Sequence, residues 1–172
     1  MTAKPSPTTQ VYRVYIKATS QAVWDAITKP EFTERFGYGG RVEYDLRPGG
    51  GYRLAATEEI KQGGRAMGFE VPDVMVDGEV IEANPPHTLV QTFRMLMDPT
   101  VAEEGFTRVT YQIDEVQGGV SRLTVTHELE GAAGLASLVS GQNEDQGAGG
   151  GWNFVLSSLK TLIETGQPLL HG

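Results

Sequence analysis

The stretch 152–163 constrains the fold more than any other part of this sequence, because its apolar residues recur at helical spacing. They fall at the first position and at three, four, seven, ten and eleven residues after it: Trp152, Val155, Leu156, Leu159, Leu162 and Ile163. This spacing gives one continuous apolar stripe. Gly166 and Pro168 then predict the end of the helix. A helix of this length spans roughly 22 Å, and its stripe must be buried against another layer of the protein.

Most of the chain before this helix has the residue pattern of antiparallel strands. Residues 10–17 are rich in β-branched and aromatic side chains, which strands favour. The pattern then changes to two short helices separated by Pro30, with Val23, Trp24 and Ile27 on one face. Further strands are predicted at 42–46, 52–56, 74–83, 88–95, 106–115 and 120–129, with glycine turns at 49–51, 63–64 and 118–119.

This order of elements predicts an α+β protein in which a curved antiparallel sheet of six to seven strands wraps around the long C-terminal helix. Short turns join neighbouring strands, which favours an antiparallel meander. We expect one domain over residues 10–166, a flexible tail at 1–9 and a C-terminal tail at 167–172. A chain of 172 residues is long enough to bury a core without disulfides.

Composition excludes several classes of function. The net charge of −8 and the scattered positions of the 14 lysines and arginines argue against binding to nucleic acid. No apolar run approaches the ~20 residues that span a bilayer. The chain has no cysteine and only three histidines, without a short-range pair, so neither a metal site nor a cofactor is expected. A cytoplasmic location is expected.

A pocket is predicted between the sheet and the helix, because a twisted sheet cannot lie flush against one helix over its whole width. The side chains that point into this gap are mostly aromatic, as in many small-molecule sites. They are Phe36, Tyr38, Tyr52, Phe93, Tyr111, His127, Trp152 and Leu156. A volume of ~300–1,000 Å³ is typical of such a pocket. The alternative is that these side chains pack together and leave no usable space.

His127 is the titratable residue with the most interesting position. Strand alternation puts it on the same inward face as Leu123, Val125 and Leu129. It could orient a ligand as a polar anchor, or act as a general base near neutral pH. It could also be a core histidine whose nitrogens are paired with a backbone carbonyl or a tyrosine. No catalytic residue is assigned.

Five stretches in a fixed order resemble one known superfamily over residues 11–165. They are VWDAITKPE at 23–31, RPGGGYR at 47–53, GEVIE at 78–82 before Asn84-Pro85-Pro86, RLTVTHE at 122–128, and Gly151-Trp152 at the start of the last helix. The chain thereby resembles the START-like or SRPBCC superfamily, with its helix-grip (Bet v-like) fold, and within it the Hsp-90 ATPase activator homologues. Phe36 stands where that family usually has a tryptophan.

The resemblance implies a fold more firmly than a function, since members of this superfamily bind lipids, hormones and polyketides and some are cyclases. The leading hypothesis is non-catalytic binding of a small hydrophobic or aromatic molecule, lipid- or polyketide-like, with a role in stress response. One alternative is a polyketide cyclase or aromatase that uses His127 with Tyr52 or Tyr111. The other is a stress-related accessory protein that works through its surface. A homodimer is compatible with the sequence. A chaperone partner is not supported, because the additional N-terminal domain of the activating co-chaperones does not precede this domain.

Overall fold

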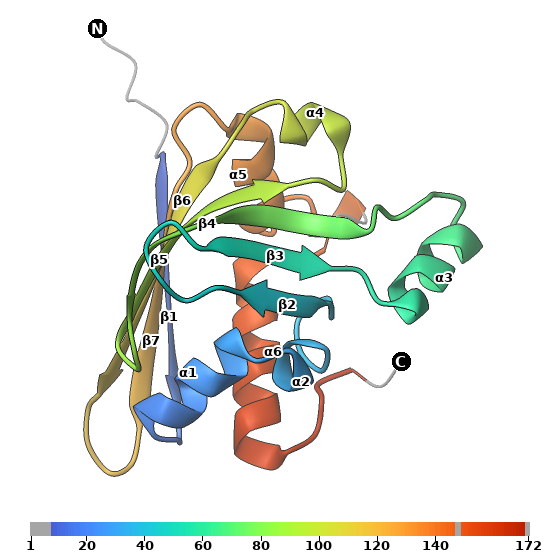
Figure 1. The fold of residues 1–172 in the computed structure, drawn as a ribbon. Coiled ribbons are helices and arrows are strands. Elements are labelled where there is room, and N and C mark those ends of the chain that lie inside the picture. The colour runs from blue at the N-terminus through green and yellow to red at the C-terminus, as the bar shows by residue number, and fades with distance from the viewer. Residues whose placement is uncertain (1–7, 147–148, 171–172) are drawn as a thin grey trace, which may run out of the picture.

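A computed structural model describes residues 8–146 and 149–170 of the chain. Its centre is a seven-stranded antiparallel sheet in the order β1-β7-β6-β5-β4-β3-β2. The strands are β1 (Thr9–Ile16), β2 (Arg41–Tyr44), β3 (Gly51–Ala55), β4 (Val74–Asn84), β5 (Thr88–Met95), β6 (Thr107–Glu115) and β7 (Ser121–Glu128). The helices are α1 (Ser20–Thr28), α2 (Pro30–Thr33), α3 (Glu58–Ala66), α4 (Pro99–Ala102), α5 (Ala133–Val139) and α6 (Gly151–Thr165), with a short 3-10 turn η1 (Glu144–Gln146). Figure 1 shows the sheet bending around α6.

The predicted α+β architecture is confirmed, including the two short helices after the first strand. Helix α6 buries four residues of the stripe, namely Trp152, Leu156, Leu159 and Leu162. It ends where the sequence predicted: Gly166 adopts the left-handed conformation with φ of 75° and donates its amide to the Leu162 carbonyl. Glycine fits this position because it has no Cβ to clash there.

The C-terminal helix lies against one side of the sheet and not across its full width. Its contacts are concentrated on β1 and α1. Strand β1 is itself an edge strand and pairs with β7 along its whole length, from Thr9 opposite Glu128 to Ile16 opposite Ser121. Strands β2 and β3 occupy the opposite edge. Because the sheet curves, this second edge lies over α6 (Figure 1), and the cavity described below lies between the two.

The predicted turn at Gly63-Gly64 was wrong, because this segment lies inside helix α3. Thr57 caps the helix by accepting the Ile60 amide at 3.2 Å, and Glu58 and Glu59 occupy its first turn. A Cβ on Gly64 would lie 2.5 Å from the Val71 side chain, so glycine serves here for close packing and not for a turn. Helix α3 projects from the edge of the sheet (Figure 1).

The first helix and the first strand have well-defined starts. Thr19 caps α1 by accepting the Ala22 amide. Strand β1 begins at Thr9, one residue before the predicted domain start. The remaining predicted tail positions at 1–7 and 171–172 lie outside the described residues. Among the helices that are described, none is long and apolar enough to cross a membrane.

Candidate ligand cavity

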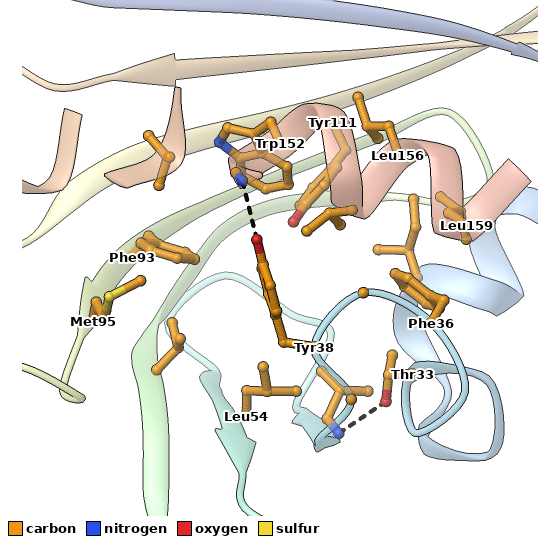
Figure 2. A pocket seen from close by; sticks show the side chains of 18 of the residues that line it. Thr33, Phe36, Tyr38, Leu54, Phe93, Met95, Tyr111, Trp152, Leu156 and Leu159 are labelled. Atoms are coloured by element: carbon orange, nitrogen blue, oxygen red, sulfur yellow. Dashed lines mark hydrogen bonds between the residues drawn. The ribbon is translucent and has the colours of Figure 1, made fainter. Parts of the chain in front are cut away.

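A cavity of about 240 Å³ lies between α6, the loop after α2 and the inner face of the sheet. Seven of the eight predicted residues line it: Phe36, Tyr38, Tyr52, Phe93, Tyr111, Trp152 and Leu156. All of them except Tyr52 are labelled in Figure 2, which shows their side chains converging on a common space from α6, from the sheet and from the loop that carries Tyr38. The side chains therefore do not pack into a filled core, although the space is smaller than the expected volume.

The wall of the cavity is almost entirely apolar. Aliphatic side chains that the sequence analysis did not assign complete it, among them Val42, Leu54, Val76, Met95, Leu123, Leu138, Val155 and Leu159. Strand alternation was the signal that could have found several of them, since Leu54 follows Tyr52 on one strand and Met95 follows Phe93 on another. Within the described part of the chain no charged side chain lines the cavity, and no group of three histidine, aspartate or glutamate residues could hold a metal ion.

The loop of residues 36–40 crosses one side of the cavity and is fixed to α6 at two points. Ser158 accepts the Gly37 amide at 2.8 Å, and the Tyr38 hydroxyl accepts the Gly151 amide at 3.0 Å (Figure 2). The φ of Gly40 is 106°, and a Cβ there would meet Leu54 at 2.8 Å, so the loop can follow this path only with glycine. Tyr38 is 54% exposed, which places it at the mouth of the cavity.

A chain of hydrogen bonds closes the opposite end of the cavity. Trp152 donates its indole N–H to Nδ1 of His127 at 3.1 Å. Because Nδ1 accepts, the neutral imidazole carries its proton on Nε2, which donates to the Thr107 hydroxyl at 2.8 Å. Thr107 in turn donates to the Phe93 carbonyl at 3.0 Å. Every polar atom in this chain is paired, and Phe93 packs edge-on against the imidazole at 5.2 Å between ring centres.

His127 is therefore the one predicted cavity residue that does not line the cavity. It points inward as predicted, but it lies behind Trp152 and is fully buried. Burial lowers the pKa of His127 to about 4, because the charged imidazolium cannot be solvated there. The sequence left three roles open for His127: a ligand anchor, a general base or a core histidine. The geometry matches the core histidine, although its partners are Trp152 and Thr107 and not a backbone carbonyl or a tyrosine.

The polar groups on the other side of Trp152 form a second cluster, here called the tyrosine cluster: Tyr44, Tyr52, Tyr111 and Gln91. Tyr44 and Tyr52 stack with ring centres 4.7 Å apart, and the Tyr44 hydroxyl donates to Oε1 of Gln91. Gln91 is fully buried, and its Nε2 has no hydrogen-bond partner within the described residues. Burial raises the pKa of all three tyrosines, so their hydroxyls remain protonated at neutral pH.

The curved sheet around α6, with an apolar space between them, defines a helix-grip protein. The sequence of residues 17–164 matches the family described as Activator of Hsp90 ATPase homolog 1-like protein. This match covers most of the chain, and the protein belongs to that family. The resemblance inferred from the five motifs is thus confirmed. None of the curated proteins compared with the chain matches it.

Solved structures share the fold at low sequence identity. DynU16, a protein of the dynemicin biosynthetic locus, matches with a TM-score of 0.64 and 19% identity over 95% of this chain and 49% of its own. An Hsp90 activator from Plasmodium falciparum matches with a TM-score of 0.61 and 17% identity over 94% and 99% of the two chains. The Aha1 dimer from Colwellia psychrerythraea matches with a TM-score of 0.61 and 18% identity over 92% and 97%. At such identities the likeness establishes the fold alone.

Proposed function

We propose that this protein binds a small, uncharged aromatic molecule in the cavity and does not transform it chemically. The observation that carries the proposal is the apolar space of about 240 Å³ between α6 and the sheet. An apolar cavity of about 150 Å³ is enough to bind benzene. Scaled to the larger volume, the space suits a ligand of about ten non-hydrogen atoms. A fused two-ring compound fits this size, whereas a long acyl chain does not.

The cavity wall favours an uncharged ligand. An ion transferred into an apolar site loses its hydration, and this loss is compensated only by a paired charge or by several hydrogen bonds. No lysine, arginine, histidine, aspartate or glutamate lines the cavity within the described residues. Aromatic rings from the loop, the sheet and α6 offer edge and face contacts of the kind that aromatic ligands prefer. These features together support an uncharged aromatic ligand.

The cyclase alternative has less support. It required a proton-transfer group in the cavity, and His127 was the candidate base. Both of its nitrogens are occupied by Trp152 and Thr107, and it lies outside the cavity wall. The tyrosines keep their protons because burial raises their pKa values, so none of them is a ready base. The alternative of an accessory protein would use exposed apolar side chains such as Met67, which is 80% exposed after α3.

The test uses indane, a two-ring hydrocarbon of nine non-hydrogen atoms, as a probe. At a concentration of about 100 Kd, binding to the folded state alone stabilises it by about 2.7 kcal/mol, which corresponds to a rise in Tm of about 5–10 °C for a chain of this size. Differential scanning fluorimetry measures the Tm, and titration calorimetry measures the Kd of indane. The variant Leu54→Trp fills the cavity and should lose the response.

A matched control is Val11→Trp, which adds the same side chain on β1 at a position 49% exposed to solvent. It should keep the full response to indane. If indane and a panel of other two-ring aromatic compounds leave the Tm of the wild-type protein unchanged, the proposed function is wrong. A response that persists in Leu54→Trp would place the binding site elsewhere.

Three finer aspects belong to the proposal as well. The cytoplasm is the proposed compartment, consistent with a sequence that has no cysteine. A homodimer is proposed because the Colwellia relative is described as a dimer, and analytical ultracentrifugation tests it. A link to stress response is proposed only through the family, and expression measured after heat shock tests it.

A further inference from the structure

Helix α5 forms part of the cavity wall. Its last two residues, Leu138 and Val139, line the cavity, while Leu135 on the same helix is buried in the core. Figure 1 shows α5 at the same end of the molecule as α4. A wall made by so short a helix can open separately from the rest of the fold if only a few contacts hold it in place.

The N-terminal end of α5 is held by a side chain from another element. Glu104 lies in the turn after α4, and its carboxylate accepts the Gly134 amide at 2.7 Å and the Leu135 amide at 2.9 Å. The N-cap residue of α5 is Ala132, which has no side-chain oxygen, so α5 cannot cap its own first turn. Hydrogen bonds to a carboxylate are stronger than those between neutral groups, and negative charge is favoured at a helix N-terminus. Glu104 therefore supplies the cap that the sequence of α5 lacks.

Glycines flank α5 on both sides. Gly131 and Gly141 both adopt the left-handed conformation, each with φ of 78°. A Cβ on Gly131 would meet nothing within 4 Å, so the chain before α5 is not packed against other parts of the protein. A Cβ on Gly141 would lie 2.5 Å from the Gly150 carbonyl oxygen, so the chain after α5 rests on the start of α6. The segment 131–141 can therefore swing or unwind while the chain that follows it stays in place.

This segment also borders the cavity mouth. A Cβ on Gly151 would lie 2.2 Å from the Val139 carbonyl oxygen, and the Gly151 amide donates to the Tyr38 hydroxyl at 3.0 Å. The end of α5 and the loop of Tyr38 thus meet at the start of α6. Leu138 and Val139 form one rim of the mouth and Tyr38 forms another. Displacement of α5 would widen the mouth on its own side.

We propose that segment 131–141 is a lid through which the ligand enters and leaves the cavity, and that Glu104 is the latch that holds this lid closed. Opening the lid exposes the buried side chain of Leu135 to water, so the open state is a minor one. A ligand then passes only during openings. A variant that opens more often accelerates both entry and exit and leaves their ratio, the Kd, nearly unchanged. This inference rests on the proposed function and concerns the regulation of the same site.

The first test measures opening of the lid without a ligand. The variants are Glu104→Ala and its matched control Glu103→Ala, which removes the neighbouring, exposed carboxylate. Amide hydrogen exchange at residues 136–139 should become about tenfold faster in Glu104→Ala, the factor expected for the loss of charge-assisted hydrogen bonds. Exchange in strands β5, β6 and β7 should not change. A role of Glu104 in overall stability alone would accelerate exchange in these strands as well.

The second test measures passage of a ligand. Stopped-flow mixing with indane can follow the fluorescence of Trp152, which lines the cavity. In Glu104→Ala the association and dissociation rate constants should rise together by about tenfold, with a Kd within about twofold of the wild-type value. Glu103→Ala should have wild-type rates. If Glu104→Ala does not fold, Glu104→Gln keeps one acceptor oxygen and should change exchange and rates in the same direction by a smaller factor.

The two proposals fail in different ways. If indane does not bind to the wild-type protein, the proposed function is wrong and this inference falls with it. If indane binds, but loss of the Glu104 carboxylate changes neither exchange in α5 nor the two rate constants, the proposed function stands and α5 is not a lid. Faster exchange in α5 with unchanged rate constants would also contradict the lid, because the ligand would then pass by another route.

Discussion

The two sides of Trp152 differ in how completely their polar groups are paired. On one side His127, Thr107 and the indole N–H form a closed chain of hydrogen bonds with no space between them. On the other side the three tyrosines of the tyrosine cluster line a cavity, and Nε2 of Gln91 behind them has no partner in the described residues. Both sides contain buried aromatic and polar residues of the same kinds. Among the described residues, only the side of the tyrosine cluster has both an unfilled volume and a donor without a hydrogen-bond partner.

This difference separates residues that hold the fold from residues that are free to hold a ligand. A paired network in a low-dielectric interior stabilises and orders a core, and removal of one member leaves its partners buried and unpaired. An unpaired donor behaves differently, since no hydrogen bond within the described residues is lost when that donor is removed. Mutations on the two sides of Trp152 should therefore have opposite effects on stability and on binding.

The largest effect is expected from His127→Leu. This change removes the acceptor of the Trp152 indole N–H and the donor to Thr107, so we expect the free energy of unfolding to fall by about 3–4 kcal/mol. Urea unfolding followed by tryptophan fluorescence measures it. A loss below about 1 kcal/mol would mean that the paired network around His127 contributes no more to stability than the tyrosine cluster on the other side of Trp152.

The next effect concerns pH. The folded state keeps His127 neutral, with a pKa of about 4, against 6.5 for an unperturbed histidine. Between these two values the unfolded chain binds a proton that the folded protein does not, so stability is complete above about pH 6.5 and falls as the pH decreases towards 4. The loss approaches about 3 kcal/mol at the lower end.

The measurement compares urea unfolding between pH 7 and pH 4.5 in the wild type, in His127→Gln and in His87→Gln. His127→Gln should lack this component of the pH dependence. His87→Gln should keep it, because His87 is an exposed residue between β4 and β5. An identical pH dependence in all three proteins would contradict the assignment.

A smaller effect is expected from Tyr38→Phe, which removes the hydroxyl that accepts the Gly151 amide at the first turn of α6. No side chain of the N-cap residue pairs with that turn, so we expect a loss of about 1 kcal/mol and faster amide hydrogen exchange at Gly151. The cavity mouth should open more often, which raises the association and dissociation rates of indane together. Tyr15→Phe should change neither exchange nor rates.

The smallest effect on stability is expected from Gln91→Leu. It removes an amide whose donor is unpaired in the described residues, but it also removes the acceptor of the Tyr44 hydroxyl, so we expect a net loss of only about 0.5–1 kcal/mol. The same urea unfolding experiment that detects the loss in His127→Leu checks it. Equal losses in the two variants would remove the distinction between the two sides of Trp152.

Much of this arrangement was predictable from the sequence because it depends on local pattern. The alternation of inward and outward residues predicted the bounds of β5 and β6 to within one residue, and the apolar stripe at helical spacing predicted α6. Helix α3 was missed although Thr57 and the acidic residues after it were a capping signal, because Gly63-Gly64 was read as a turn. The inward direction of His127 followed from alternation, and so did that of Tyr52, Phe93 and Tyr111 among the residues that line the cavity.

The pairing of polar atoms could not be predicted in the same way. His127 is paired with Trp152 and Thr107, which lie on different elements, and no spacing along the chain brings the three together. Alternation with Phe93 puts Gln91 on the inward face of β5, but whether its amide is paired depends on Tyr44, which lies 47 residues away on the edge strand β2. Such contacts are set by the tertiary fold and by the exact curvature of the sheet.

The pairing of β1 with β7 has a consequence for synthesis of the protein. The first strand joins the sheet only through a partner more than a hundred residues later in the chain. At translation rates of about 5–20 residues per second, β1 leaves the ribosome on the order of ten seconds before its neighbour exists. During that interval both of its hydrogen-bonding edges are open to other chains. In the cell, β1 must therefore remain solvated and unpaired until β7 has been synthesised and can pair with it.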